Sequence, residues 1–333
     1  MQGLRSRWEG EMRRALVLGA TGFIGGQIAR AACTAGFEVH GLRRRPGAVG
    51  AVGDQPLVWH EGDLSNPASL EAAMQGCEVL FHAAGYAPRT ERSVPQAVRQ
   101  GVSEMRNVLE AAGRAGVRRV VYTSSLSTIG PPPPGSGRLA DERDGYLPGS
   151  TGNAYYEVKW AMEHEALRAT LSGLPVVILC PTAVFGPGDV KPSTSEILLR
   201  LARGQLPFGV DQETNIVDGR DVALAHIRAA TQGTPGRRYI IGGYNLNVAE
   251  ALRQAAEVLG VRPPRWTLST GTVARLLRVA DAVRLPIPAT MRAIPYWQPL
   301  NSRKGQETFG FIPRPFEETV RDTVDWFREH GYL

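Results

Sequence analysis

The sequence predicts an α/β protein with a doubly wound parallel sheet, helices on both faces, and a second, smaller, mostly helical lobe. Three observations lead to this fold. Near the start of the chain, an apolar strand runs through a glycine turn into a helix. Further strands alternate with helical segments as far as residue 123, the pattern of a doubly wound sheet. The 333 residues are enough for one large or two modest domains with a sizeable core.

The glycine turn follows the apolar run at residues 15–18 and comes before apolar residues at helical spacing. Glycines suit a tight turn whose backbone must approach a pyrophosphate, and the helix N-terminus supplies unpaired N–H groups. The turn therefore predicts a dinucleotide-binding site, with a purely structural turn as the alternative. The cofactor-binding residues expected from it are Gly19, Thr21, Gly22, Phe23, Ile24 and Gly25.

Two arginines, Arg43 and Arg44, follow the second predicted strand, about nineteen residues after Gly25. Enzymes specific for NAD carry an acidic residue here for the ribose 2′-hydroxyl, whereas an arginine accommodates a 2′-phosphate. No acidic residue stands at this point, so we expect NADP(H) to be preferred and NAD(H) to be possible. Arg44 is the first choice and Arg43 the second, and a solvated basic loop is the alternative.

Small and polar residues follow the next strands. Asp63 and Leu64 come after the third strand, where a carboxylate can accept from the adenine amine, and a helix over 67–74 should follow, capped by Asn66. Ala83, Ala84 and Gly85 come after the fourth strand and would let the cofactor lie against the backbone. We expect His82 to be a packed imidazole with its hydrogen bonds satisfied rather than a catalyst. The fifth strand, 117–123, leads into Ser124 and Ser125.

A helix predicted over 153–172 carries Tyr155 and Lys159 four residues apart, hence on one face. A phenol has a reference pKa near ~10, and a nearby ammonium favours the phenolate. The pair is therefore a candidate acid/base at neutral pH, although such pairs also occur on exposed helices. Tyr156 has no lysine at that spacing.

Composition narrows the class of protein. The net charge is +6, but the arginines are scattered without a basic block, so we expect a small-molecule substrate and no nucleic acid. The sequence contains no apolar stretch of about twenty residues, so we expect no membrane-spanning helix. Cys33, Cys77 and Cys180 lie far apart, which favours a reducing cytoplasm and predicts neither a metal site nor a disulfide framework.

Taken together, these motifs resemble the extended short-chain dehydrogenase/reductase family, also called the NAD-dependent epimerase/dehydratase family. The resemblance continues through residues 180–189, 215–223 and the closing helix at 317–332. Residues 188–192 and 239–243 are most similar to dihydroflavonol-4-reductase-like proteins and to hopanoid-associated sugar epimerases.

The resemblance implies a Rossmann domain with Ser125, Tyr155 and Lys159 as catalytic residues. It implies that Tyr155 and Lys159 also contact the cofactor, and it places Thr123, Pro181, Thr182 and Val184 beside it. The chain departs from the family at 101–102, where Gly-Val replaces a common Asn-Val, and at Cys180, where Arg or Asn is frequent. The arginine and asparagine that grip a sugar-nucleotide diphosphate have no clear counterparts here.

These features divide the chain into a loose tail (1–12), a dinucleotide-binding domain (13–188 plus 213–243) and a substrate-binding lobe (189–212 plus 244–333). Within the lobe, residues 271–299 carry apolar residues at helical spacing. Core packing is favoured for them over a lid or membrane-surface element. The family resemblance also suggests a homodimer formed through the helices at 94–115 and 153–172. The apolar residues expected in surplus there are Ala97, Val108, Leu109, Ala112, Trp160, Met162 and Leu167.

The predicted activity is hydride transfer between NADP(H) and a carbonyl or alcohol of a small, hydrophobic or cyclic substrate. A nucleotide-sugar epimerase or dehydratase that uses its cofactor transiently is the alternative. A regulator that senses the cofactor without turnover is disfavoured by the intact Ser125, Tyr155 and Lys159.

Overall fold

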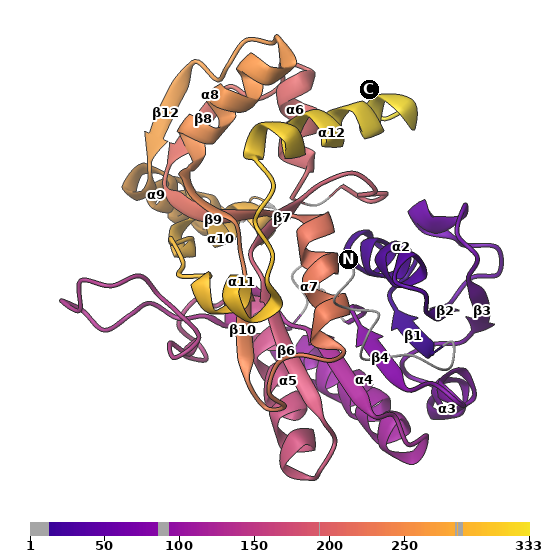
Figure 1. Ribbon diagram of the computed structural model, residues 1–333. Helices are drawn as coiled ribbons and strands as arrows, with labels where there is room; N and C mark the ends of the chain where they lie inside the picture. Colours follow the sequence, from indigo (N-terminus) through magenta and orange to yellow (C-terminus); the bar gives the residue numbers. More distant parts are fainter. Residues whose placement is uncertain (1–12, 86–92, 193, 284, 286–288) are drawn as a thin grey trace.

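The main body of the protein is a seven-stranded parallel sheet in the order β10-β6-β5-β4-β1-β2-β3 (Figure 1). The computed structural model describes residues 13–333 except 86–92, 193, 284 and 286–288, so the predicted tail at 1–12 lies outside the described residues. The strands are β1 (Arg14–Leu18), β2 (Glu38–Arg43), β3 (Val58–Glu61), β4 (Val79–His82), β5 (Arg119–Thr123), β6 (Val176–Pro181) and β10 (Arg238–Ile241). The strand order reverses beside β1, between β1 and β4, which is where open α/β sheets bind ligands.

Helices cover both faces of this sheet, as predicted. One face packs against α2 (Phe23–Thr34) and α7 (Gly219–Ala229), and the other against α3 (Pro67–Met74), α4 (Val94–Arg114) and α5 (Ala154–Leu171). Successive strand residues alternate between two buried cores, since side chains of a strand point to opposite faces. Two short 3₁₀ helices, η1 (Gly50–Val52) and η2 (Leu126–Thr128), lie in the connections.

The predicted cap of α3 is present, and α5 begins with an asparagine cap as well. The Asn66 side chain accepts a hydrogen bond from the Ser69 N–H at 3.3 Å and starts α3. Asn153 accepts from the Tyr155 N–H at 3.0 Å and starts α5. Both asparagines satisfy an N–H group that the first helical turn leaves unpaired.

The smaller lobe lies above the carboxyl ends of the main strands in Figure 1 and is mostly helical. Its helices are α6 (Glu196–Ala202), α8 (Val248–Leu259), α9 (Thr270–Ala282), α10 (Ala289–Ala293), η3 (Ile294–Tyr296) and α12 (Phe316–Glu329). It also holds a parallel pair of strands, β8 (Phe208–Asp211) and β12 (Trp266–Ser269). Among the described residues, no helix is both long enough and apolar enough to cross a bilayer.

Of residues 213–243, which the sequence assigns to the dinucleotide-binding domain, α7 and β10 lie on the main sheet, whereas β9 (Glu213–Asp218) does not join it. A separate three-stranded sheet forms instead from β7 (Ala183–Phe185), β9 and β11 (Tyr244–Asn247). The chain then crosses back once more through α11 (Arg303–Phe309), whose Phe309 is buried against Tyr239 of β10 with ring centroids 5.0 Å apart. The last residues before α12 therefore contribute to the core of the main sheet.

The apolar surface expected in surplus on α4 and α5 is largely buried within the subunit, so that expectation is wrong. Ala97, Val108, Leu109, Ala112 and Met162 are all buried, while Trp160 and Leu167 are half-buried. The reason is that α4 and α5 pack against each other as well as against the sheet, with Arg106 and Glu165 paired at 2.8 Å along their outer edge.

Segment 271–299 also departs in part from expectation. Core packing is confirmed for Val273 and Ala280, which are buried, and Leu277 packs with Val273 against Ile294. It is wrong for Leu276 and Val279, which are exposed. A single helix can bury only the stripe that faces its lobe.

Candidate active site

The glycine turn brings three segments of backbone into contact. Gly19 has a φ of +91°, and a Cβ on it would lie 2.9 Å from the backbone of Ala83 and Ala84. A Cβ on Gly25 would lie 2.1 Å from the Gly19 oxygen. Only glycine fits at these two positions, because any side chain would push β1, α2 and the end of β4 apart.

The N-terminus of α2 faces this turn and is open. Its cap residue is Gly22, no described side chain caps it, and its first turn holds no acidic residue. Thr21, Phe23 and Ile24 are half-buried around it. Unpaired N–H groups and the positive end of the helix dipole fit the pyrophosphate of a dinucleotide.

The segment after β4 forms the adjacent wall. Ala83 donates its N–H to the Leu18 carbonyl at 3.0 Å, which holds the segment against β1. A Cβ on Gly85 would lie 2.9 Å from the Met162 side chain. Residues 83–85 thus present only small side chains here, and their contact with the cofactor stays a prediction.

The two arginines after β2 differ in their surroundings. Arg43 is mostly buried over the Trp59 ring, at 5.5 Å from its centroid, and lies 3.7 Å from Glu61. The Arg44 side chain is 80% exposed and its Nε lies 3.9 Å from an oxygen of Asp63. Hydrogen bonds from Ser65 hold the pKa of Asp63 below its usual value. Arg44 and Asp63 are therefore both charged at one corner of the sheet, with Leu64 packed into the core behind them.

The three residues predicted as catalytic lie together. The Tyr155 hydroxyl donates to the Ser125 Oγ at 3.2 Å, and the Lys159 ammonium donates to the Thr123 carbonyl at 3.4 Å. Lys159 Nζ is 6.0 Å from the centre of the Tyr155 ring. Helix α5 thus presents both side chains to the end of β5.

His226 of α7 holds Thr123 from the other face of the sheet. Its Nδ1 is 2.8 Å from the Val222 carbonyl and must carry the proton, since a carbonyl only accepts. Its Nε2 therefore accepts from the Thr123 hydroxyl at 2.8 Å. Burial lowers the pKa of His226 to about 4, which keeps the ring neutral. The sequence offered no periodic or motif signal for this contact.

Tyr156, next to the predicted acid/base, is buried among aromatic rings. Its ring centroid lies 5.6 Å from Tyr146 and 6.0 Å from Tyr296. Burial raises its pKa further above the usual range. Its hydroxyl is thus poorly suited to exchange a proton near neutral pH.

Sequence reasoning missed Glu163, which is buried one turn beyond Lys159. Its carboxylate accepts from the hydroxyls of Ser124 and of Thr128, the latter at 2.8 Å, and pairs with Arg238 Nε at 2.8 Å. Its spacing of four from Lys159 was a usable signal, because it puts both on one helical face. Burial, with the negative charge of Glu163 in second place, raises the pKa of the nearby Cys180 thiol to about 12.

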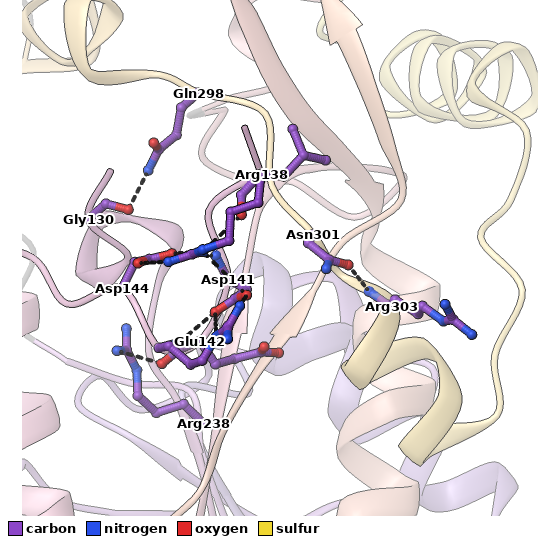
Figure 2. A network of polar contacts seen from close by, with 11 residues as sticks. Gly130, Arg138, Asp141, Glu142, Asp144, Arg238, Gln298, Asn301 and Arg303 are labelled. Carbon is purple, nitrogen blue, oxygen red and sulfur yellow. Dashed lines mark hydrogen bonds and ion pairs between the residues drawn. The ribbon is translucent and has the colours of Figure 1, made fainter. Parts of the chain in front are cut away.

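The loop between β5 and α5 is held by a polar network (Figure 2). Arg138 makes two hydrogen bonds of 2.6 Å to Asp144, and Arg238 donates to the Glu142 carbonyl. Gln298, from the smaller lobe, donates to the Gly130 carbonyl at 3.0 Å. The loop is therefore fixed to both lobes near Ser125.

Pro181, Thr182 and Val184 lie where the chain passes from β6 to β7 and are buried. The Thr182 hydroxyl has no hydrogen-bond partner among the described residues. A buried hydroxyl without a partner is costly, so it fits a site that receives a polar group such as a carboxamide.

His82 is packed, as expected, with its ring centroid 5.5 Å from that of Tyr122. The expectation that its hydrogen bonds are satisfied is wrong, because neither ring nitrogen has a partner among the described residues. Its neighbours in register are Leu18, which offers no polar side-chain atom, and Tyr122. Burial, with the charge of Lys159 in second place, lowers the pKa of His82 to about 3.

The chain is similar to proteins of a known family. Residues 15–242 match the NAD dependent epimerase/dehydratase family. The chain belongs to this family. It is 32% identical over 329 residues to a putative dihydroflavonol 4-reductase of Synechocystis, covering 95% of both chains. It is 29% identical over 334 residues to sterol demethylase protein B of Methylococcus capsulatus, covering 96% of this chain and 99% of that one.

A solved structure has a similar fold. A nucleoside-diphosphate-sugar epimerase from Pseudomonas aeruginosa superposes with a TM-score of 0.83 at 27% identity, covering 97% of this chain and 100% of that one. Membership of the epimerase/dehydratase family identifies this chain as an NAD(P)-dependent oxidoreductase of the extended short-chain class.

The buried pair of Glu163 and Arg238 gives a prediction for stability. Glu163→Gln leaves Arg238 as a buried charge without its partner and should lower the free energy of unfolding by about 3–5 kcal/mol. Glu165→Gln is the matched control on the same helix. Its partner Arg106 is half exposed, so less than about 1 kcal/mol should be lost. Chemical denaturation of both variants measures the difference, and equal losses would contradict the structural role of Glu163.

Proposed function

We propose that this protein uses NADPH to reduce a carbonyl group of a small, largely apolar ring compound, with Tyr155, Ser125 and Lys159 as its catalytic residues. The observation that carries this proposal is the hydrogen bond of 3.2 Å between the Tyr155 hydroxyl and the Ser125 Oγ, beside the ammonium of Lys159. A carbonyl oxygen that enters between the two hydroxyls can accept a hydrogen bond from each.

Each residue has a distinct role. Tyr155 gives its proton to the substrate oxygen as that oxygen becomes an alcohol, and Ser125 holds the oxygen in line. Lys159 carries a positive charge near the phenol ring, which stabilises the negative charge left on the Tyr155 oxygen. The nicotinamide cofactor, when bound, supplies the hydride.

The substrate class rests on the named relatives. One is called a reductase of a dihydroflavonol and another takes its name from a sterol. Both compounds are built of fused or linked rings and carry no ionised group. For the present chain, the absence of clear counterparts to the residues that grip a sugar diphosphate supports the same class.

The cofactor preference rests on Arg44. Its guanidinium is exposed at the end of β2, where the 2′-phosphate of NADP would lie beside the adenosine ribose. Asp63, 3.9 Å away, keeps the arginine in place through charge. We propose that NADPH is the working cofactor and that NADH binds more weakly.

We also propose that the enzyme works in the cytoplasm as a homodimer. The free thiols of Cys33, Cys77 and Cys180 support a reducing compartment. The part of α4 and α5 that remains outside, with Trp160 and Leu167 half-buried, is the proposed contact. We also propose that the folded protein is divided, as the sequence predicts, into a dinucleotide-binding domain and a substrate-binding lobe.

Single substitutions at the predicted catalytic residues test the chemistry. Tyr155→Phe removes only the hydroxyl, so turnover should fall by roughly 10²–10⁴ while NADPH still binds. Ser125→Ala should also lower turnover with little effect on cofactor affinity. NADPH oxidation with a dicarbonyl compound, and fluorescence titration of the cofactor, measure the two quantities.

Tyr156→Phe is the control for this series, since it removes the same atom one position away. Turnover should stay near that of the wild type, because the Tyr156 hydroxyl lies among aromatic rings. A dead Tyr156→Phe beside an active Tyr155→Phe would show that the tyrosine assignment is wrong.

The cofactor preference is tested by Arg44→Ala. Loss of a charge-assisted contact should weaken NADPH binding by about 1–3 kcal/mol and leave NADH binding unchanged. Arg45→Ala, which removes an exposed neighbouring charge, is the control and should change neither affinity. Wild-type protein that binds NADH as tightly as NADPH would overturn the proposal.

A nucleotide-sugar epimerase is the second candidate, favoured by the likeness to the Pseudomonas aeruginosa epimerase. The two activities differ in cofactor balance. A reductase consumes one NADPH for each product molecule, whereas an epimerase returns the hydride within the turnover. We expect NADPH consumption with ring ketones and no epimer from UDP- or dTDP-sugars. Epimer formation without cofactor consumption would favour the second candidate.

A further inference from the structure

The positive charge of this protein is concentrated in one segment of the smaller lobe. Residues 261–300 hold six arginines and a single acidic residue, a net charge of +5 against +6 for the whole chain. The segment contains β12, α9, α10 and η3. Four of these arginines are exposed: Arg262, Arg265, Arg275 and Arg278.

Helix α9 has two apolar faces, and only one of them packs on the lobe. Val273 and Leu277 pack with Val210, Ile294 and Trp297 in a small core, and Ala280 on the same face is also buried. Leu276 and Val279 lie on the neighbouring face of α9, since a helix has about 3.6 residues per turn. Val283, one residue after the helix, continues this spacing and donates its N–H to the Val279 carbonyl at 3.1 Å. These three side chains are 55–61% exposed.

Two further large apolar side chains are exposed close to this stripe in the chain. Trp266, on the strand that leads into α9, is 63% exposed, and Leu285, just after the helix, is 56% exposed. In Figure 1, β12 and α9 lie next to each other at the outer edge of the smaller lobe. We call Trp266, Leu276, Val279, Val283 and Leu285 the exposed apolar patch.

Exposed arginines accompany this patch. Arg275 and Arg278 lie on α9 next to the exposed stripe, and no described acidic residue pairs with either. Arg265 is exposed beside Trp266, with its guanidinium 5.9 Å from the indole centroid. Exposed apolar and cationic side chains thus occur together on α9 and on the neighbouring strand β12.

The same segment reaches the predicted catalytic helix. The Tyr296 hydroxyl donates to the Thr151 carbonyl at 3.3 Å, and its ring packs on Tyr156. Gln298 donates to the carbonyls of Ile129 and Gly130. The basic, apolar segment is therefore continuous with the wall of the active site.

We propose that the exposed apolar patch and its arginines dock this protein on the surface of an anionic lipid bilayer. Leucine, valine and tryptophan side chains enter the boundary between headgroups and acyl chains, while arginines bind the lipid phosphates. A nucleic acid would pair with the arginines but leave the apolar stripe in water, so a lipid surface fits both features. Such docking needs no spanning helix.

This docking would place the active site at the membrane, in which apolar ring compounds dissolve. The segment that carries the patch also contacts Tyr156 and the loop at 129–130, so docking would hold the candidate active site near the bilayer. Lipid binding itself is independent of the chemistry at Tyr155.

Vesicle flotation of the full chain tests the proposal. The wild type should bind vesicles of phosphatidylcholine mixed with phosphatidylglycerol and bind pure phosphatidylcholine far more weakly. Arg275→Gln combined with Arg278→Gln should lower the partition coefficient about five-fold for each arginine. Leu276→Ser combined with Val279→Ser should abolish binding at moderate salt.

The control variants carry changes of the same kind at exposed positions elsewhere, and the effect of Arg321→Gln is compared per arginine. Leu171→Ser with Ile312→Ser alters two apolar side chains that are 90% and 89% exposed, and Arg321→Gln removes an exposed charge from α12. Circular dichroism should show all variants folded, and reduction of a water-soluble dicarbonyl should be unchanged.

Three outcomes would overturn the proposal. One is a wild type that does not bind anionic vesicles. Another is a pair of patch variants that bind as well as the controls. The third is self-association that depends on the patch, seen by light scattering without vesicle binding, which would make a second copy of the chain the occupant.

Discussion

The geometry of the candidate site depends on the contact between α5 and the end of β5. Three successive turns of the helix each hold a different group there. Tyr155 reaches Ser125, Lys159 reaches the Thr123 carbonyl, and Glu163 binds the Ser124 hydroxyl. Because the three side chains share one helical face, a rotation or shift of α5 would break all three contacts together. The spacing of the two hydroxyls is thus set by a whole helix rather than by a flexible loop.

Much of the fold could be predicted from local patterns in the sequence. Apolar runs gave the parallel strands, Asn66 and Asn153 marked the starts of helices, and the glycines at 19, 22 and 25 marked the tight turn between β1 and α2. These signals are local, because the residues that make each contact or cap lie within one motif. The candidate catalytic tyrosine and lysine were visible for the same reason, as a pair one helical turn apart.

The contacts that could not be predicted from the sequence join segments that lie far apart in the chain. Glu163 meets Arg238 across 75 positions, and His226 meets Thr123 from the opposite face of the sheet. The sequence around each of these residues does not indicate its partner. The predictions for the apolar faces of helices were wrong for a related reason. Periodicity shows that a face is apolar but not what covers it. Residues of α4 turned out to face α5 and the sheet, whereas Leu276 and Val279 of α9 face no part of the lobe.

The link between Glu163 and Arg238 also bears on the order in which the enzyme can form during synthesis. A nascent chain that has released α5 from the ribosome already contains Ser125, Tyr155 and Lys159. Its buried glutamate, however, has no countercharge until β10 emerges and joins the edge of the sheet beside β6. A buried charge without a partner is strongly unfavourable, so helix and strand are not locked together in that intermediate. The candidate catalytic residues would therefore reach their native arrangement late, once most of the polypeptide has been made.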